Sequence, residues 1–253
     1  MCYDTNLTDA RWQIIAAFIE DGRKRKYSLR TVIDALLYVV KTGCQWRYLP
    51  KDFPKWQLVY YYFRKFATTG WSEILHDTVR ERVRVKKGKE VSPSLGLVDS
   101  QSVKTASLTE EKGIDGNKKV NGRKRFIVTD TLGLMMGLLI VAANVGERAG
   151  AEKLFNQGQG KYPRLQKVLA DQGFAGETYV SRIELLFGFV FEIVNQVLGV
   201  GGFQVQPKRW IVERTFGWLM WHRRLVKDYE ENTDVSKAFQ LAMIRLMLKQ
   251  LTI

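Results

Sequence analysis

The chain has only two cysteines and two histidines among its 253 residues. Cys2 and Cys44 are too few for a disulfide framework. Even together with His76 and His222 they do not suggest a zinc cluster. Any metal that this protein binds is therefore expected to be held by oxygen ligands such as carboxylates.

Long hydrophobic runs are also missing. The longest one, LGLMMGLLIVAA at 132–143, is too short to span a bilayer and is interrupted by two glycines, which favours a buried strand. The opening residues, MCYDTNLTDARWQ, do not combine a cationic start with an apolar stretch, so secretion is not indicated. We therefore expect a cytoplasmic protein that does not associate with membranes.

Acidic residues are scarce relative to basic ones. There are 26 Asp and Glu against 40 Lys and Arg, which gives a formal net charge of +14. Such a surplus on an ordered protein favours a polyanionic partner, with nucleic acid as the first candidate and an acidic membrane surface, which the short apolar run at 132–143 disfavours, as the second. Hydrophobic residues make up 45% of the chain and charged residues 26%, which is typical of a globular fold and argues against long disordered tracts.

Residues 1–91 have the patterns of short helices. Thr8 and Ser28 are plausible capping residues at two helix starts, and the basic run at 80–89 leads into VSPSLG, where we place a domain boundary. Several short helices with a basic joint predict a small all-α, helix-turn-helix-like DNA-binding domain. A helical bundle with a solvated basic face is the alternative. The basic joint is the RKRK sequence, Arg23, Lys24, Arg25 and Lys26.

Residues 92–253 change to a strand-rich pattern. SLGLVDSQSVK and KRFIVTDTLGLMMGLLIVAANV read as three strands, and the segments that follow read as helix, strand, helix, strand and helix. Parallel neighbouring strands need helical crossovers, so this order predicts an α/β domain with a mixed sheet flanked by helices.

Two aspartates follow apolar strand-like runs. Asp99 stands in GLVDSQS and Asp171 in KVLADQGF, and such strand ends converge at one edge of an α/β sheet. Two adjacent carboxylates repel each other and need a cation, and Mg²⁺ prefers carboxylate oxygens. Each aspartate alone is equally consistent with a turn or a helix cap. Asp115 and Asp130 are interpreted as loop and turn acids.

A third acid stands in RWIVERTFGWLMWHRRL, residues 209–225. At 100° per residue, Glu213 shares a helix face with Arg209 and Gly217, away from the apolar stripe. Glu213 is therefore open either to a metal shared with the aspartates or to a simple ion pair with Arg209. Of the tryptophans, Trp218 is expected in the core, whereas Trp210 and Trp221 remain candidates for DNA contacts.

The order Asp99, Asp171, Glu213 resembles the DDE transposases of bacterial insertion sequences, which have an RNase H-like catalytic domain. The likeness also runs through LTDARWQII, GCQWRYLPKDFPKWQLVYYYFRKF, LVDSQSVK, GNKKVNGRKRFIVTDTLG, ADQGF and RRLVKDYE. Members often carry a signature of Tyr, two residues, Arg, three residues, Glu, six residues and Lys. Arg209 keeps its spacing to the glutamate, whereas Gln206 and Met220 replace the Tyr and the Lys.

The resemblance implies a metal-dependent DNA transposase. Asp99, Asp171 and Glu213 would be its catalytic and metal-binding triad, holding two Mg²⁺ ions, with Mn²⁺ as a substitute, for nicking and strand transfer. The alternatives are a non-catalytic, sequence-specific DNA-binding regulator and a general RNase H-like nuclease. The first would bind specific DNA ends without cutting them, and the second would cut without regard to end sequence.

Double-stranded DNA is the expected partner, as the inverted repeats of the element and as target DNA. Cutting two ends together implies a homodimer or higher oligomer on DNA, in a nucleoid-associated setting. Besides the RKRK joint, we expect phosphate contacts from GNKKVNGRKR, for which a merely solvated loop is the alternative, and from the segment 209–225. The candidate residues are Lys118, Lys119, Arg123, Lys124, Arg125, Arg209, Arg223 and Arg224.

Overall fold

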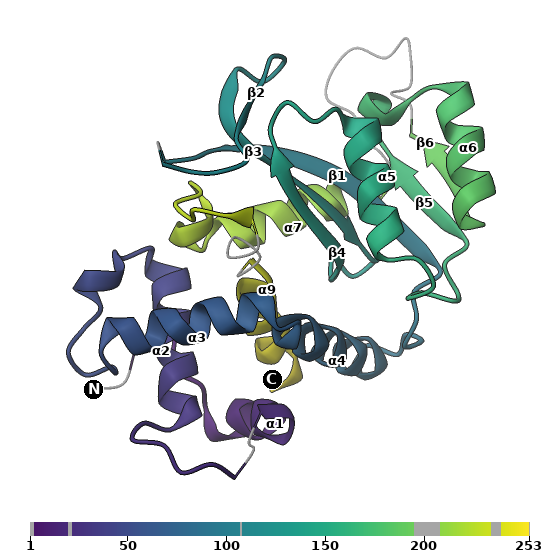
Figure 1. The fold of residues 1–253 in the computed structure, drawn as a ribbon. Helices are drawn as coiled ribbons and strands as arrows, with labels where there is room; N and C mark the ends of the chain where they lie inside the picture. The colour runs from purple at the N-terminus through teal and green to yellow at the C-terminus, as the bar shows by residue number, and fades with distance from the viewer. Residues whose placement is uncertain (1–2, 20–21, 107, 195–207, 234–238, 253) are drawn as a thin grey trace.

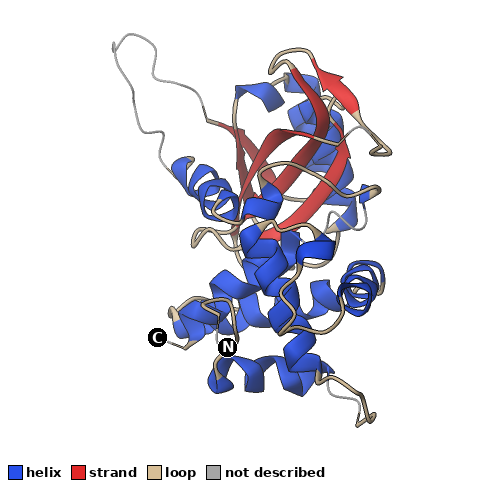
Figure 2. Ribbon diagram, turned by 90° about the vertical axis from the view of Figure 1, so that its left-hand side faces the viewer, coloured by secondary structure: helices blue, strands red, loops and turns tan. Residues whose placement is uncertain are grey.

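The computed structural model describes residues 3–19, 22–106, 108–194, 208–233 and 239–252. It has a helical part and a sheet part, which meet along the long helix α4 (Figure 1). The same two parts are separated along the long direction of the molecule in Figure 2, with the strands gathered at one end.

The first 86 residues form the helices that the sequence predicts. The elements are α1 (Asp9–Ile19), α2 (Leu29–Thr42), the 3-10 turn η1 (Trp46–Tyr48), α3 (Trp56–Thr68) and α4 (Trp71–Lys86). The Ser28 side chain accepts a hydrogen bond from the backbone N–H of Thr31 and so caps α2, while Gly43 ends the helix with a left-handed φ of 69°.

The sheet part is a mixed sheet with helices on both faces. Its strands are β1 (Leu95–Lys104), β2 (Gly113–Asp115), β3 (Val120–Thr129), β4 (Met135–Ala142), β5 (Lys167–Ala170) and β6 (Val190–Ile193). Strand β1 lies between antiparallel β3 and parallel β5, β6 extends the sheet beyond β5, and β2 and β4 both pair with β3. The arrangement confirms the expected RNase H-like α/β fold. The three-residue strand β2 was not predicted because it is too short to show a periodic pattern.

The two faces of the sheet have separate cores. Helices α5 (Glu147–Gln157) and α6 (Glu177–Phe187) cover one face, where they pack on Val98 and Phe126 (Figure 1). Helix α7 (Trp210–Met220) packs on the other face, against Leu97 and Ile127. Alternate residues of one strand thus serve two different cores.

The helical part is completed by a segment from the far end of the sequence. Helix α9 (Phe239–Leu251) packs among α1, α2 and α4, and one continuous core runs from these helices through α7 to the sheet (Figure 1). The domain boundary between residues 91 and 92 stays a prediction. Buried side chains from the helical part and the sheet part belong to the same core on either side of this boundary.

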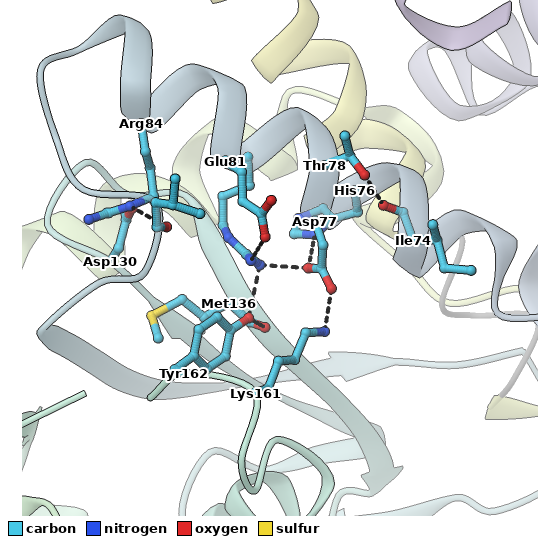
Figure 3. Close-up of polar contacts among 12 residues, drawn as sticks. Ile74, His76, Asp77, Thr78, Glu81, Arg84, Asp130, Met136, Lys161 and Tyr162 are labelled. Atoms are coloured by element: carbon cyan, nitrogen blue, oxygen red, sulfur yellow. Dashed lines mark hydrogen bonds and ion pairs between the residues drawn. The ribbon is translucent and has the colours of Figure 1, made fainter. Parts of the chain in front are cut away.

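Polar contacts also join α4 to the sheet part. Asp77 pairs with Arg80 at 2.6 Å and with Lys161 at 2.5 Å, and Arg80 donates to the Tyr162 hydroxyl, which donates in turn to the carbonyl of Met136 (Figure 3). These contacts connect α4 both to strand β4 and to the segment that precedes β5. They orient the helical part relative to the sheet.

A second contact at this joint is fully buried. Arg84 of α4 forms an ion pair with Asp130, and the two side chains are 5% and 0% exposed (Figure 3). Asp130 also accepts hydrogen bonds from the backbone N–H groups of Leu132 and Leu134, both at 2.9 Å. The prediction that Asp130 is a turn acid is therefore confirmed, and the same carboxylate fastens the turn to α4.

We expect His222 to make the fold acid-sensitive. This residue follows α7, and burial, with smaller contributions from Arg245 and Lys41, lowers its pKa to about 4. The unfolded chain binds a proton near pH 6.5 and the folded chain only near pH 4, so stability falls as the pH decreases through that window, by roughly 3 kcal/mol. Urea unfolding at several pH values measures this loss, which His222→Gln removes. Parallel pH curves for the two proteins would contradict the assignment.

Candidate active site

The strand register brings Asp99 and Asp171 to the same level of the sheet. Leu97 of β1 is the partner of Leu169 of β5 in parallel register, and each aspartate lies two residues further on. Asp99 is not at the end of its strand, as the sequence suggested, because β1 continues to Lys104 by pairing with β3 after β5 has ended. Among the described residues, β1 therefore has no strand partner on its β5 side at Asp99.

Each aspartate is held by one carboxylate oxygen and presents the other. Asp171 caps the 3-10 turn η2 (Gln172–Phe174), where its Oδ1 accepts from the backbone N–H of Gly173 at 2.9 Å. Asp99 Oδ1 accepts from the N–H of Ser100 at 2.7 Å. The interpretation of Asp171 as a capping residue and its candidacy for the site are thus compatible, because different oxygens serve the two purposes.

Helix α7 brings the third acid over these strands. Val212, Thr215 and Leu219 form its buried stripe, as the helical phase predicts. Thr215 donates to the carbonyl of Gly133 in the β3–β4 turn at 2.8 Å, and a Cβ on Gly133 would lie only 2.8 Å from the Thr215 hydroxyl. Gly133, with φ +81°, therefore permits the close approach that positions α7 and turns Glu213 toward the aspartates.

All three acids converge on one guanidinium nitrogen. Arg209 Nη2 lies 3.8 Å from Asp99 Oδ2, 3.4 Å from Asp171 Oδ2 and 3.6 Å from Glu213 Oε1. The ion pair of Arg209 with Glu213 was expected from their spacing of four residues. Its contacts with the two aspartates were not, because they depend on how α7 docks on the sheet.

The three carboxylates differ in exposure. The side chains of Asp99, Asp171 and Glu213 are 16%, 39% and 58% exposed, so the site is closed at β1 and open at α7. Burial raises the pKa of Asp99 to about 6, despite the nearby Arg209 and the N–H of Ser100, and Asp171 adds to the increase. A carboxylate that is destabilised in this way gains most from a nearby cation.

The donor set is suited to a hard divalent cation. Three carboxylates face one point, and Mg²⁺ and Mn²⁺ bind such oxygens in proteins. Among the described residues, no three Asp, Glu, His or Cys side chains are placed to hold a metal ion as they stand, and the guanidinium of Arg209 lies among the three acids. Metal binding at this place therefore requires Arg209 to move.

Several of the predicted DNA contacts lie on the surface. Arg25 and Arg224 are partly buried, and Arg224 pairs with Glu230 at 2.6 Å. Arg209 is only 6% exposed and belongs to the carboxylate cluster. The exposed candidates are Arg23, Lys24, Lys26, Lys118, Lys119 and Arg223.

Three other candidates are inside the protein. Arg123, Lys124 and Arg125 are at most 3% exposed, because they lie on β3 between β1 and β4 and not in a loop. Arg123 pairs with Asp228, and Arg125 donates to the carbonyl of Leu225 at 2.6 Å. Their charges therefore stabilise the fold, and these three side chains do not reach a DNA backbone in this structure.

Lys124 belongs to a buried network of ion pairs that the sequence does not predict. Its ammonium lies 3.0 Å from Glu147 and 3.3 Å from Asp115. Burial acts against the ionised form of Asp115, but hydrogen bonds from Ser102 and the N–H of Lys118 and the charge of Lys124 outweigh it and lower its pKa to about 2. No spacing in the sequence connects these distant acids to one lysine.

Asp115 also positions a surface lysine, Lys118, near the candidate site. Asp115 Oδ1 accepts from the backbone N–H groups of Asn117 and Lys118, which fixes the turn after β2. Lys118 Nζ then donates to the carbonyl of Ser100 at 3.3 Å, next to Asp99. A cation is thus held close to Asp99.

The remaining expectations concern α7 and the turn that follows it. Gln206 lies outside the described residues. Met220 is partly buried against the core, so a lysine there would lose apolar contacts. Trp210 and Trp221 are 45% and 75% exposed. Trp218 is only partly buried and its ring lies against the guanidinium of Arg214, so the expectation that it lies in the core is wrong.

Comparison with known proteins identifies the family of this chain. A family model described as "Transposase DDE domain" matches residues 90–248, which include all three acids. The chain belongs to this DDE transposase family. A second model, "Putative transposase of IS4/5 family", matches residues 7–76 of this DDE transposase, in the helical part.

A curated relative of the DDE transposase is described as "Putative transposase for insertion sequence element IS402", from Burkholderia cepacia. The two are 30% identical over 125 residues, and the match spans 47% of this chain and 58% of the relative. The chain thus covers less than two thirds of that relative's length. In the described part of the DDE transposase, no helix has both the length and the apolar character needed to span a membrane.

Proposed function

We propose that this protein binds the inverted ends of an insertion sequence and catalyses divalent-metal-dependent DNA cleavage and strand transfer. The observation that carries the proposal is the convergence of Asp99, Asp171 and Glu213 within 4 Å of one nitrogen of Arg209. Membership of the DDE transposase family supports the same chemistry. The description of the curated relative as a transposase for an insertion sequence is consistent with it.

We assign the three acids different roles as metal ligands according to their positions. Asp99 and Asp171 would be the central ligands of two Mg²⁺ ions, or of Mn²⁺, because they lie at the same level of neighbouring chain segments and both Oδ2 atoms are within 4 Å of Arg209 Nη2. Glu213, on the open side, would complete the ligand set where DNA enters. When bound, the ions supply Lewis-acid activation of the attacking and leaving oxygens of a phosphodiester. The protein residues fix the oxygen positions and hold the scissile phosphate in line.

The DNA would be held by basic residues on both parts of the chain. Lys118 lies beside Asp99 and is suited to a phosphate near the scissile bond, with Lys119 and Arg223 as further contacts. Residues 23–26, in the joint between α1 and α2, would contact the DNA ends at a distance from the chemistry. Handling two ends together implies a homodimer or higher oligomer.

The proposal is tested by incubating the protein with Mg²⁺ and DNA that carries the inverted repeats flanking its coding region. We expect cleavage at the repeat ends with the wild-type protein and none with Asp171→Ala. Identical cleavage by the two proteins would refute the assignment. Specific binding without cleavage under any divalent ion would favour a DNA-binding regulator, and cleavage that ignores the end sequence would favour a general nuclease.

A further inference from the structure

Arg209 forms more than one ion pair. Its side chain is almost entirely buried, and one nitrogen faces three carboxylates from β1, from the residue that caps η2 and from α7. Three like charges at this separation repel each other, and a cation among them offsets that repulsion. Arg209 therefore acts as the counter-ion of the cluster in the metal-free protein.

The contacts of Arg209 are loose. Its three distances to carboxylate oxygens are 3.4–3.8 Å, longer than the 2.7–2.9 Å of a charge-assisted hydrogen bond. None is a two-pronged arginine–carboxylate pair. In addition, Nε and Nη1 are buried and have no hydrogen-bond partner among the described residues, which is costly for a guanidinium. The side chain is thus attracted to the cluster electrostatically without being locked in it.

We propose that Arg209 is a displaceable counter-ion, which keeps the three acids together before metal is bound and must leave when the metal enters. This inference rests on the proposed function, because it takes the three acids to be the metal ligands. A guanidinium at the point shared by the three oxygens excludes a cation from that point, so Arg209 and the metal compete. Arg209 thereby weakens metal binding at the three acids.

Displacement would also free the donors of Arg209 for another anion. Nε and Nη1 each carry an N–H donor that would then be available to a phosphate oxygen. DNA that supplies this phosphate would therefore favour the displaced position and raise the metal affinity of the site. The inference thus links metal loading to the presence of substrate.

The decisive experiment measures Mn²⁺ binding in the absence of DNA by electron paramagnetic resonance. We expect Arg209→Met to bind Mn²⁺ at least about tenfold more tightly than the wild type, because a competing positive charge has been removed. Arg182→Met is the matched control. Arg182 is exposed on α6 and pairs with Glu152, so its removal changes the net charge equally but leaves the site intact.

Thermal unfolding gives a second readout that does not depend on activity. Without metal, Arg209→Met is expected to unfold at a lower temperature than the wild type, and Mg²⁺ is expected to raise its midpoint by more than it raises that of the wild type. A merely structural arginine would lower the midpoint without increasing the response to metal. Arg209→Gln, which keeps a polar group, serves if the methionine variant does not fold.

Two outcomes separate this inference from the proposed function. Unchanged or weaker Mn²⁺ binding by the Arg209 variants, together with a loss of binding in Asp171→Asn, would overturn the counter-ion role and leave the proposed triad intact. If Asp171→Asn binds Mn²⁺ as the wild type does, the triad itself is not the metal site. The proposed function and the inference then fail together.

Discussion

Replacing Asp99 with cysteine is expected to abolish Mg²⁺-supported DNA cleavage, with a loss on the order of 10³-fold or more, and to leave part of the activity in Mn²⁺. A thiolate is a soft ligand that binds Mg²⁺ poorly, whereas Mn²⁺ tolerates sulfur better. Asp99 is the most enclosed of the three acids, so a lost oxygen there is not easily replaced by water. The shorter cysteine side chain also fits the space.

The measurement is the ratio of cleavage rates in Mn²⁺ and Mg²⁺. We expect this ratio to increase at least about tenfold over that of the wild type, since only the metal-ligand bond differs between the two ions. Ser181→Cys places a thiol on the exposed side of α6 and controls for nonspecific effects of sulfur. A ratio in Asp99→Cys equal to that of the wild type would show that Asp99 does not contact the metal.

Replacing Arg84 with methionine is expected to lower the free energy of unfolding by about 3–5 kcal/mol, because it leaves the buried carboxylate of Asp130 without its partner. Asp130 is fully buried, and its remaining hydrogen bonds come from two backbone N–H groups of the turn. The Arg84 guanidinium also donates to the carbonyl of Glu90 at 2.7 Å, so this acceptor loses its donor as well.

Urea unfolding at neutral pH checks this loss. Lys87→Met removes an exposed cation from the end of the same helix and should change stability by less than about 0.5 kcal/mol. Arg84→Met combined with Asp130→Asn should recover part of the loss, because no unpaired charge is then buried. If Arg84→Met is as stable as Lys87→Met, the ion pair does not contribute to the joint between α4 and the sheet.

The sequence was informative where a periodic pattern decides the structure. The phase of the helix at 210–220 predicted that Val212 and Leu219 are buried and that Glu213 is not, and all three are as expected. If the same helical phase continued to Val226, that residue would be buried as well, but it is 56% exposed because the helix ends at Met220. Helix ends depend on local tertiary contacts that the periodicity does not contain.

The sequence was least informative about buried charges. GNKKVNGRKR was interpreted as a basic loop because charged residues are usually exposed, yet Arg123 and Arg125 lie in the central part of the sheet. Their partners come from residues about 100 positions further along the chain. Asp99 and Asp171 could be placed near each other from strand patterns alone, whereas the position of Arg209 among three acids required the docked helix.

The place of α9 in the helical part constrains how the protein forms during translation. Helix α4 ends at Lys86 and α9 begins at Phe239, so about 150 residues are synthesised between them. At roughly 5–20 residues per second, the first helices emerge from the ribosome on the order of ten seconds before the segment that covers them. Until then their apolar faces stay open, and a nascent chain that stops after Glu213 still lacks part of its core. Chaperones therefore have an extended interval in which to bind the N-terminal helices.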